Sequence, residues 1–112
     1  MDIRERVVGA ATVVELVGRL TVADQPGAVK AAVASAVDRG SRHVLLDLSG
    51  VGYIDSTRLG ELIAAHVTVS RRGGRFSLIG TPVRIGVLLT IAGLNDVFER
   101  FLTVEDATKA AS

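Results

Sequence analysis

Hydrophobic positions in the first part of the chain follow two different periods. Runs rich in β-branched residues at 3–8 and 12–17 flank the short segment Gly9-Ala10-Ala11, a spacing that is typical of a β-hairpin. Between residues 28 and 38, apolar side chains recur every three or four positions, which predicts a helix with one buried face. Gly40 stands where such a helix is expected to end. The pattern therefore predicts a hairpin followed by a helix.

The rest of the chain alternates short aliphatic runs with longer segments of helical period. The predicted elements are, in order, a strand at 43–48, a glycine-punctuated connection at 49–54, a helix at 57–72, a strand at 75–79, a helix that closes at Gly93, a short strand at 99–102 and a last helix through residue 111. The apolar side chains that the third helix presents are Val83, Val87, Leu88 and Ile91. Alternating strands and helices imply parallel pairing, and the opening hairpin makes the α/β sheet mixed.

Composition limits the classes of function that the chain can carry. Its 112 residues, 48% of them hydrophobic, suit one compact domain with an ordinary buried core. The net charge is only +1, and Arg71, Arg72 and Arg75 are too few for a nucleic-acid-binding face. There is no cysteine for disulfides or thiolate metal sites, and no apolar run of membrane-spanning length. We expect a cytoplasmic protein that neither binds nucleic acid directly nor crosses a membrane.

Catalysis, metal binding and cofactor binding find little support in the sequence. The hydroxyls of Ser56 and Thr57 would need a base, and His66 lies about two and a half helical turns beyond Thr57. His43 begins an aliphatic strand, so both histidines are interpreted as structural. The chain has neither recognised metal-ligand spacing nor a glycine-rich nucleotide motif. We expect no catalytic, metal or cofactor residues; a small hydrolase is the weakest alternative.

The junction between the strand and the second helix holds the remaining candidate chemistry. Asp55 or Ser56 can cap the helix by accepting hydrogen bonds from the free amides of its first turn. The same amides and the helix dipole favour negative charge, so a phosphate on Thr57 or Ser56 need not unfold the domain. Such a phosphate adds roughly two negative charges, which would repel an acidic partner surface. The residues alone leave both capping and modification open.

The segment Ile54-Asp55-Ser56-Thr57-Arg58-Leu59-Gly60 resembles the Asp-Ser-Ser/Thr-Gly-Leu-Gly motif of STAS domains, the family of bacterial anti-sigma factor antagonists. Further likeness, in the family's order and spacing, comes from Gly18-Arg19-Leu20, Val44-Leu45-Leu46-Asp47-Leu48, Gly73-Gly74 and Ala92-Gly93-Leu94. The likeness runs from about residue 5 to 107. It implies a single STAS-like α/β domain over residues 1–112, with an N-terminal hairpin, a four- to five-stranded mixed sheet and about four packed helices.

The same resemblance implies a function and a set of site residues. Antagonists of this family bind a kinase-type (serine/threonine) anti-sigma factor and free the sigma factor, and phosphorylation switches that binding off. The acceptor position corresponds to Thr57, with Ser56 as the second choice. The expected partner-binding residues are Thr21, Asp55, Ser56, Thr57, Arg58, Leu59 and Glu61. The alternative is a non-phosphorylated STAS interaction subunit of a stress-signalling assembly or a lipid-transport complex. Whether the chain forms a homodimer is left open at this point.

Two positions depart from the family pattern and motivate the alternative. Arg58 stands where glycine is usual, which predicts a long cation at the partner contact. That cation could pair with a phosphate on Thr57, or it could mark an altered interface. Thr21 stands where antagonists commonly carry an aspartate, so the acidic side chain expected in that loop is missing.

Overall fold

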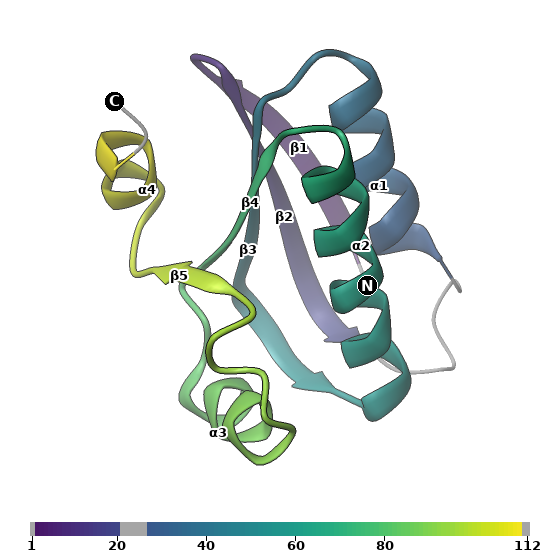
Figure 1. Cartoon of the computed structure of the whole chain (residues 1–112). Coiled ribbons are helices and arrows are strands. Elements are labelled where there is room, and N and C mark those ends of the chain that lie inside the picture. The colour runs from purple at the N-terminus through teal and green to yellow at the C-terminus, as the bar shows by residue number, and fades with distance from the viewer. Residues whose placement is uncertain (1, 21–26, 111–112) are drawn as a thin grey trace.

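One mixed sheet organises the computed structural model, which describes residues 2–20 and 27–110 (Figure 1). The strands are β1 (Asp2–Val8), β2 (Ala11–Leu20), β3 (His43–Ile54), β4 (Arg75–Ile79) and β5 (Glu99–Phe101), and the helices are α1 (Ala28–Asp38), α2 (Ser56–Arg71), α3 (Val83–Ile91) and α4 (Val104–Ala110). The strands lie in the order β1-β2-β3-β4-β5, with β1 antiparallel to β2 and every other neighbouring pair parallel. The predicted mixed α/β sheet with an opening hairpin is confirmed. No helix of the described residues is long and apolar enough to span a membrane.

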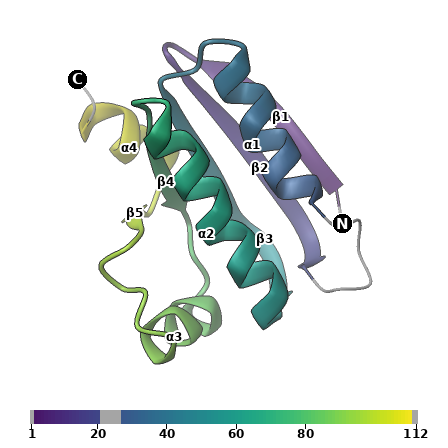
Figure 2. The same cartoon turned by 45° about the vertical axis from the view of Figure 1, so that its right-hand side comes forward.

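Alternate side chains of the central strands face two different layers of helices. Val44, Leu46 and Leu48 of β3 belong to the main core, where α1 and α2 lie side by side on one face of the sheet (Figure 2). Leu45 points the other way and packs in a smaller cluster with Ala107 of α4. Both faces of β3 are therefore covered, as its continuous aliphatic run predicts.

The predicted connection at 49–54 is wrong, because β3 continues as a strand to Ile54. Strand β2 also runs past residue 17, to Leu20, and pairs in parallel with the extension of β3, with shifts in register. Gly50 is needed here for close approach: a Cβ at this position would lie 3.1 Å from the carbonyl oxygen of Leu16. The glycines that predicted a loop thus mark an irregular strand, which carries the chain directly to the start of α2.

Helix α3 turns a different face to the core from the one expected. Its buried side chains are Ile85 and Leu89, whereas Val83, Val87 and Ile91 are 85%, 51% and 78% exposed. The segment is apolar on almost every side, so its hydrophobic period does not select one face. Packing against the sheet determines that Ile85 and Leu89 are buried, and it leaves an aliphatic stripe of Val83, Val87 and Ile91 exposed.

Polar side chains of β3, β4 and β5 form one connected network of hydrogen bonds. Arg75 donates to Glu99 through two nitrogens, at 2.6 and 2.5 Å, and the buried Ser77 hydroxyl donates to Glu99 at 2.6 Å. The Nε2 atom of His43 lies 2.8 Å from the Ser77 oxygen, while its Nδ1 is buried without a hydrogen-bond partner. Burial, helped by the Arg75 cation, lowers the pKa of His43. Hydrogen bonding from Arg75 lowers the pKa of Glu99, and the network ties β5 to β4.

Candidate functional site

Asp55 sets the start of α2 at the end of β3. Its backbone is extended, with φ −93° and ψ 172°, and its Oδ1 accepts a hydrogen bond from the backbone N–H of Arg58 at 2.9 Å. Its carbonyl accepts the next bond, from Leu59, at 3.0 Å. This is the geometry of a helix N-cap, so the predicted capping by Asp55 is confirmed.

The two hydroxyl residues of the motif stand in the first turn of α2 and are exposed. Ser56 opens the helix and lines a groove beside it, and Thr57 follows on the outer surface. Leu59, in contrast, is 6% exposed and belongs to the hydrophobic core. Thr21 lies outside the described residues. The expected partner-binding set is therefore split between surface and core.

Arg58 does not extend toward solvent as the sequence led us to expect. The residue is 4% exposed, and one of its terminal nitrogens lies 2.7 Å from Oε2 of Glu61 in a buried ion pair. The other carboxylate oxygen of Glu61 accepts a hydrogen bond from the backbone N–H of Lys30, in the first turn of α1, at 3.0 Å. Arg58 and Glu61 therefore join the starts of α1 and α2, and the expected extended cation is absent from this surface. Contact between Arg58 and a partner stays a prediction.

The helical period carries the signal for this placement. Positions 58, 62, 65 and 69 follow one another at steps of four, three and four, and all four residues are on the buried face of α2. Glu61 stands three residues after Arg58, which is close enough for an ion pair on one helix. Because position 58 falls on the buried face of α2, the helical period predicts a buried ion pair between Arg58 and Glu61.

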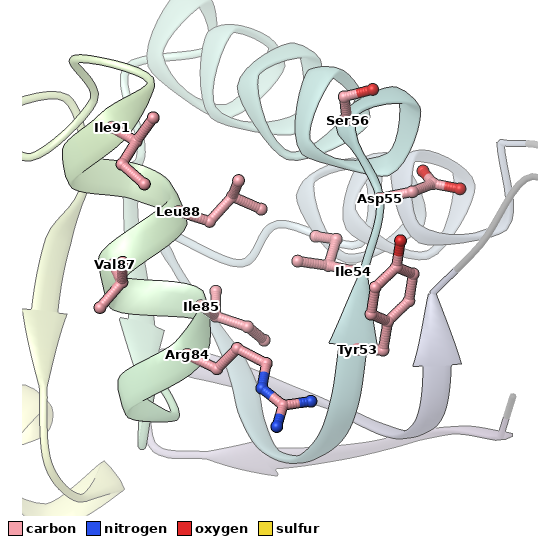
Figure 3. A pocket seen from close by; sticks show the side chains of 9 residues that line it. All are labelled: Tyr53, Ile54, Asp55, Ser56, Arg84, Ile85, Val87, Leu88 and Ile91. Atoms are coloured by element: carbon pink, nitrogen blue, oxygen red, sulfur yellow. The ribbon is translucent and has the colours of Figure 1, made fainter.

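A groove of about 340 Å³ opens beside the motif, between α3 and the junction of β3 with α2 (Figure 3). Its lining residues are Tyr53, Ile54, Asp55, Ser56, Arg84, Ile85, Val87, Leu88 and Ile91. Most of the lining surface is apolar, and Arg84 contributes a guanidinium that points from α3 toward β3 in Figure 3. This groove was not predicted from the sequence, because residues 49–54 were expected to form a connection and α3 was expected to bury Val87 and Ile91.

Neither histidine lies in a catalytic arrangement with Ser56 or Thr57. His66 packs edge-on against Phe76 and Phe98, with ring centroids 6.0 and 5.7 Å away. His43 is committed to the Ser77 network. Within residues 2–20 and 27–110 no group of three or more His, Cys, Asp or Glu side chains could hold a metal ion.

Comparisons with known proteins place this geometry in a family. A family model described as Mlab, STAS domain, matches residues 3–104. An anti-sigma-B factor antagonist from Staphylococcus aureus is 33% identical over 58 residues, which cover 52% of this chain and 54% of that protein. The chain thus spans less than two thirds of the length of the curated relatives that it matches.

Solved structures share the whole fold at lower sequence identity. An anti-sigma-factor antagonist (STAS) domain protein from Planctomyces limnophilus superposes with a TM-score of 0.82 at 23% identity, covering 100% of both chains. The Bacillus cell fate determinant SpoIIAA in its phosphorylated form gives a TM-score of 0.74 at 17% identity, covering 99% of this chain and 100% of that one. Identities this low establish the fold alone, but the family model covers almost all of the sequence. The resemblance is confirmed: this chain belongs to the STAS domain family.

Proposed function

We propose that this chain is an anti-sigma factor antagonist that binds a kinase-type anti-sigma factor and is switched off by phosphorylation of Thr57. The observation that carries the proposal is the exposed pair Ser56-Thr57 at a helix start that Asp55 caps. The match to a Staphylococcus aureus protein named an anti-sigma-B factor antagonist supports the same function. A fold neighbour described in a phosphorylated form supports a phosphorylation switch in this architecture.

A phosphate on Thr57 would change the electrostatics of the surface without requiring a change of fold. Thr57 is exposed, so a kinase could reach its hydroxyl, and a phosphate in the first helical turn is favoured by the helix dipole. Arg58 is held by Glu61 and points inward, so it is not expected to neutralise the new charge. About two extra negative charges would then stand beside the groove and repel an acidic partner.

Phosphorylation by the cognate anti-sigma kinase and ATP, mapped by mass spectrometry, tests the switch. We expect one phosphate, on Thr57, that is lost in Thr57→Ala and kept in Ser56→Ala. The matched control is Ser70→Ala, which removes an exposed hydroxyl from the other end of α2. Thr57→Glu should weaken binding of the kinase. An unmodified Thr57, or a Thr57→Glu variant that binds as well as the parent chain, would refute the switch.

A second candidate function is a STAS interaction subunit that is not phosphorylated, in a stress-signalling assembly or a lipid-transport complex. The matching family model, described as Mlab, STAS domain, favours it, as does Arg58 in the usual place of glycine. Affinity purification of the full chain from its own cells separates the two. Recovery of permease or ATPase subunits without a kinase would support the second function, and recovery of a kinase-type partner would support the first.

A further inference from the structure

An uncovered aliphatic stripe on α3 borders the groove next to the motif. Val83, Val87 and Ile91 follow at steps of four, so they lie along one side of the helix over about 12 Å. They stand opposite the buried Ile85 and Leu89, which hold the helix on the sheet. Uncovered stripes of this kind, rimmed by polar residues, mark interaction sites.

Arginine side chains flank this stripe on both sides. Arg84 lines the groove, and within the described residues its guanidinium has neither a hydrogen bond nor an ion pair. On the other side, a terminal nitrogen of Arg100 lies 3.3 Å from the position of a Cβ built on Gly86, so its guanidinium lies over α3. Arg19, stacked on the Tyr53 ring at 4.9 Å, adds a third cation near the far wall. Helix α3 itself contains no acidic residue.

We propose that the groove and the stripe bind an amphipathic helical segment of the partner protein, with aliphatic side chains on its ridge and carboxylates on both flanks. The ridge would fill the groove of about 340 Å³, and the carboxylates would meet Arg84 and Arg100. This inference deepens the proposed function, on which its assignment to the anti-sigma factor rests. A phosphate on Thr57, next to the groove-lining Ser56, would repel such an acidic segment.

Charge and shape select this occupant over two others. In a two-fold symmetric dimer formed through this groove, a second copy would bring the same arginines against Arg84 and Arg100, and like charges across an interface are unfavourable. An anionic bilayer would match the charge, but it is broad and flat, whereas Tyr53 and Leu88 line opposite walls of a concave site (Figure 3). A ridge of side chains on a helix fits a groove.

Titration of the isotope-labelled chain with a synthetic peptide tests the site directly. The probe is a 14-residue helical peptide with leucines along one face and glutamates on both flanks; its matched control carries lysine in place of each glutamate. We expect NMR shifts at Tyr53, Val87 and Ile91, and affinity for the glutamate peptide roughly tenfold above that for the lysine peptide, since two ion pairs are at stake. No shift at the groove, or equal binding of the two peptides, would overturn the proposal.

Variants then separate the groove from the phosphorylation switch. The double variant Val87→Ser/Ile91→Ser should bind both the glutamate peptide and the kinase partner at least about fivefold more weakly than the parent chain. Val7→Ser, 73% exposed on β1, should change neither. Peptide binding without any kinase partner would support the groove and refute the antagonist. If Thr57 is phosphorylated and the double variant binds the kinase partner as well as the parent chain does, the antagonist function is supported and the groove is refuted. Binding of anionic phospholipid vesicles alone, lost in the double variant, would refute the peptide site.

Discussion

Replacing Arg58 with methionine tests whether the buried ion pair holds the starts of α1 and α2 together. Methionine keeps the aliphatic stem of the side chain and removes its charge, so packing changes little. The carboxylate of Glu61, whose side chain is 9% exposed, would lose its contact with the guanidinium at 2.7 Å. It would keep the hydrogen bond from the Lys30 N–H at 3.0 Å.

The expected loss of stability is about 3 kcal/mol. Removing one member of a buried ion pair typically costs about 3–5 kcal/mol, because the other charge is left without its partner. The hydrogen bond to Lys30 places this case at the lower end of that range. For a chain of 112 residues the entropy of unfolding is about 0.24 kcal/mol per degree, so the melting temperature should fall by about 13 °C.

Chemical denaturation of Arg58→Met, Glu61→Gln and the double variant measures the pair as a cycle. The double variant should recover most of the loss, because it removes both buried charges together. Arg72→Met is the matched control, since Arg72 pairs with Asp38 at a similar distance, 3.0 Å, but with side chains 56% and 67% exposed. It should cost less than about 1 kcal/mol. A loss below about 1 kcal/mol for Arg58→Met, or strict additivity in the cycle, would refute the reasoning.

Three further predictions concern the sheet and the helix cap. Because burial lowers the pKa of His43, the folded state favours its neutral form. The free energy of unfolding should therefore fall as pH drops below about 6.5, by at most about 1.4 kcal/mol per pH unit. Denaturation curves of His43→Asn at several pH values should lack this dependence. Gly50→Ala should cost about 1–3 kcal/mol because its Cβ meets the Leu16 carbonyl at 3.1 Å, whereas Gly52→Ala on the same strand, with nothing within 4 Å, should cost little; equal melting temperatures would contradict this. Asp55→Ala should lose about 1 kcal/mol by the same assay through the missing cap, and an unchanged midpoint would show that the cap is dispensable.

Most of the fold could be predicted from the sequence, because its elements differ clearly in period. The helix at Ala28–Asp38 and the strand at Arg75–Ile79 have the predicted bounds. The end of β3 could not be predicted locally: glycine favours loops, and only pairing with the extension of β2 keeps residues 49–54 extended. The inward face of α3 is likewise decided by what it packs against.

The candidate site was predictable in position but not in surface chemistry. The order Asp55-Ser56-Thr57 indicated a cap followed by hydroxyls, and the exposed hydroxyls and the cap follow from local helix geometry. The inward placement of Arg58 depends on α1. The backbone N–H of Lys30 in α1 binds Glu61, the ion-pair partner of Arg58, although Lys30 lies 31 positions before Glu61 in the sequence. The groove depends on two elements whose relative placement no local pattern encodes.

The pairing of Arg58 with Glu61 has a consequence for how this sequence can diverge. A chain with glycine at position 58 and glutamate at 61 would bury a carboxylate without its cation, and a chain that lost only the carboxylate would bury an unpaired cation. Substitution at either position is therefore expected to be followed by substitution at the other. We therefore expect arginine at position 58 to occur together with an acidic residue at position 61 in related sequences.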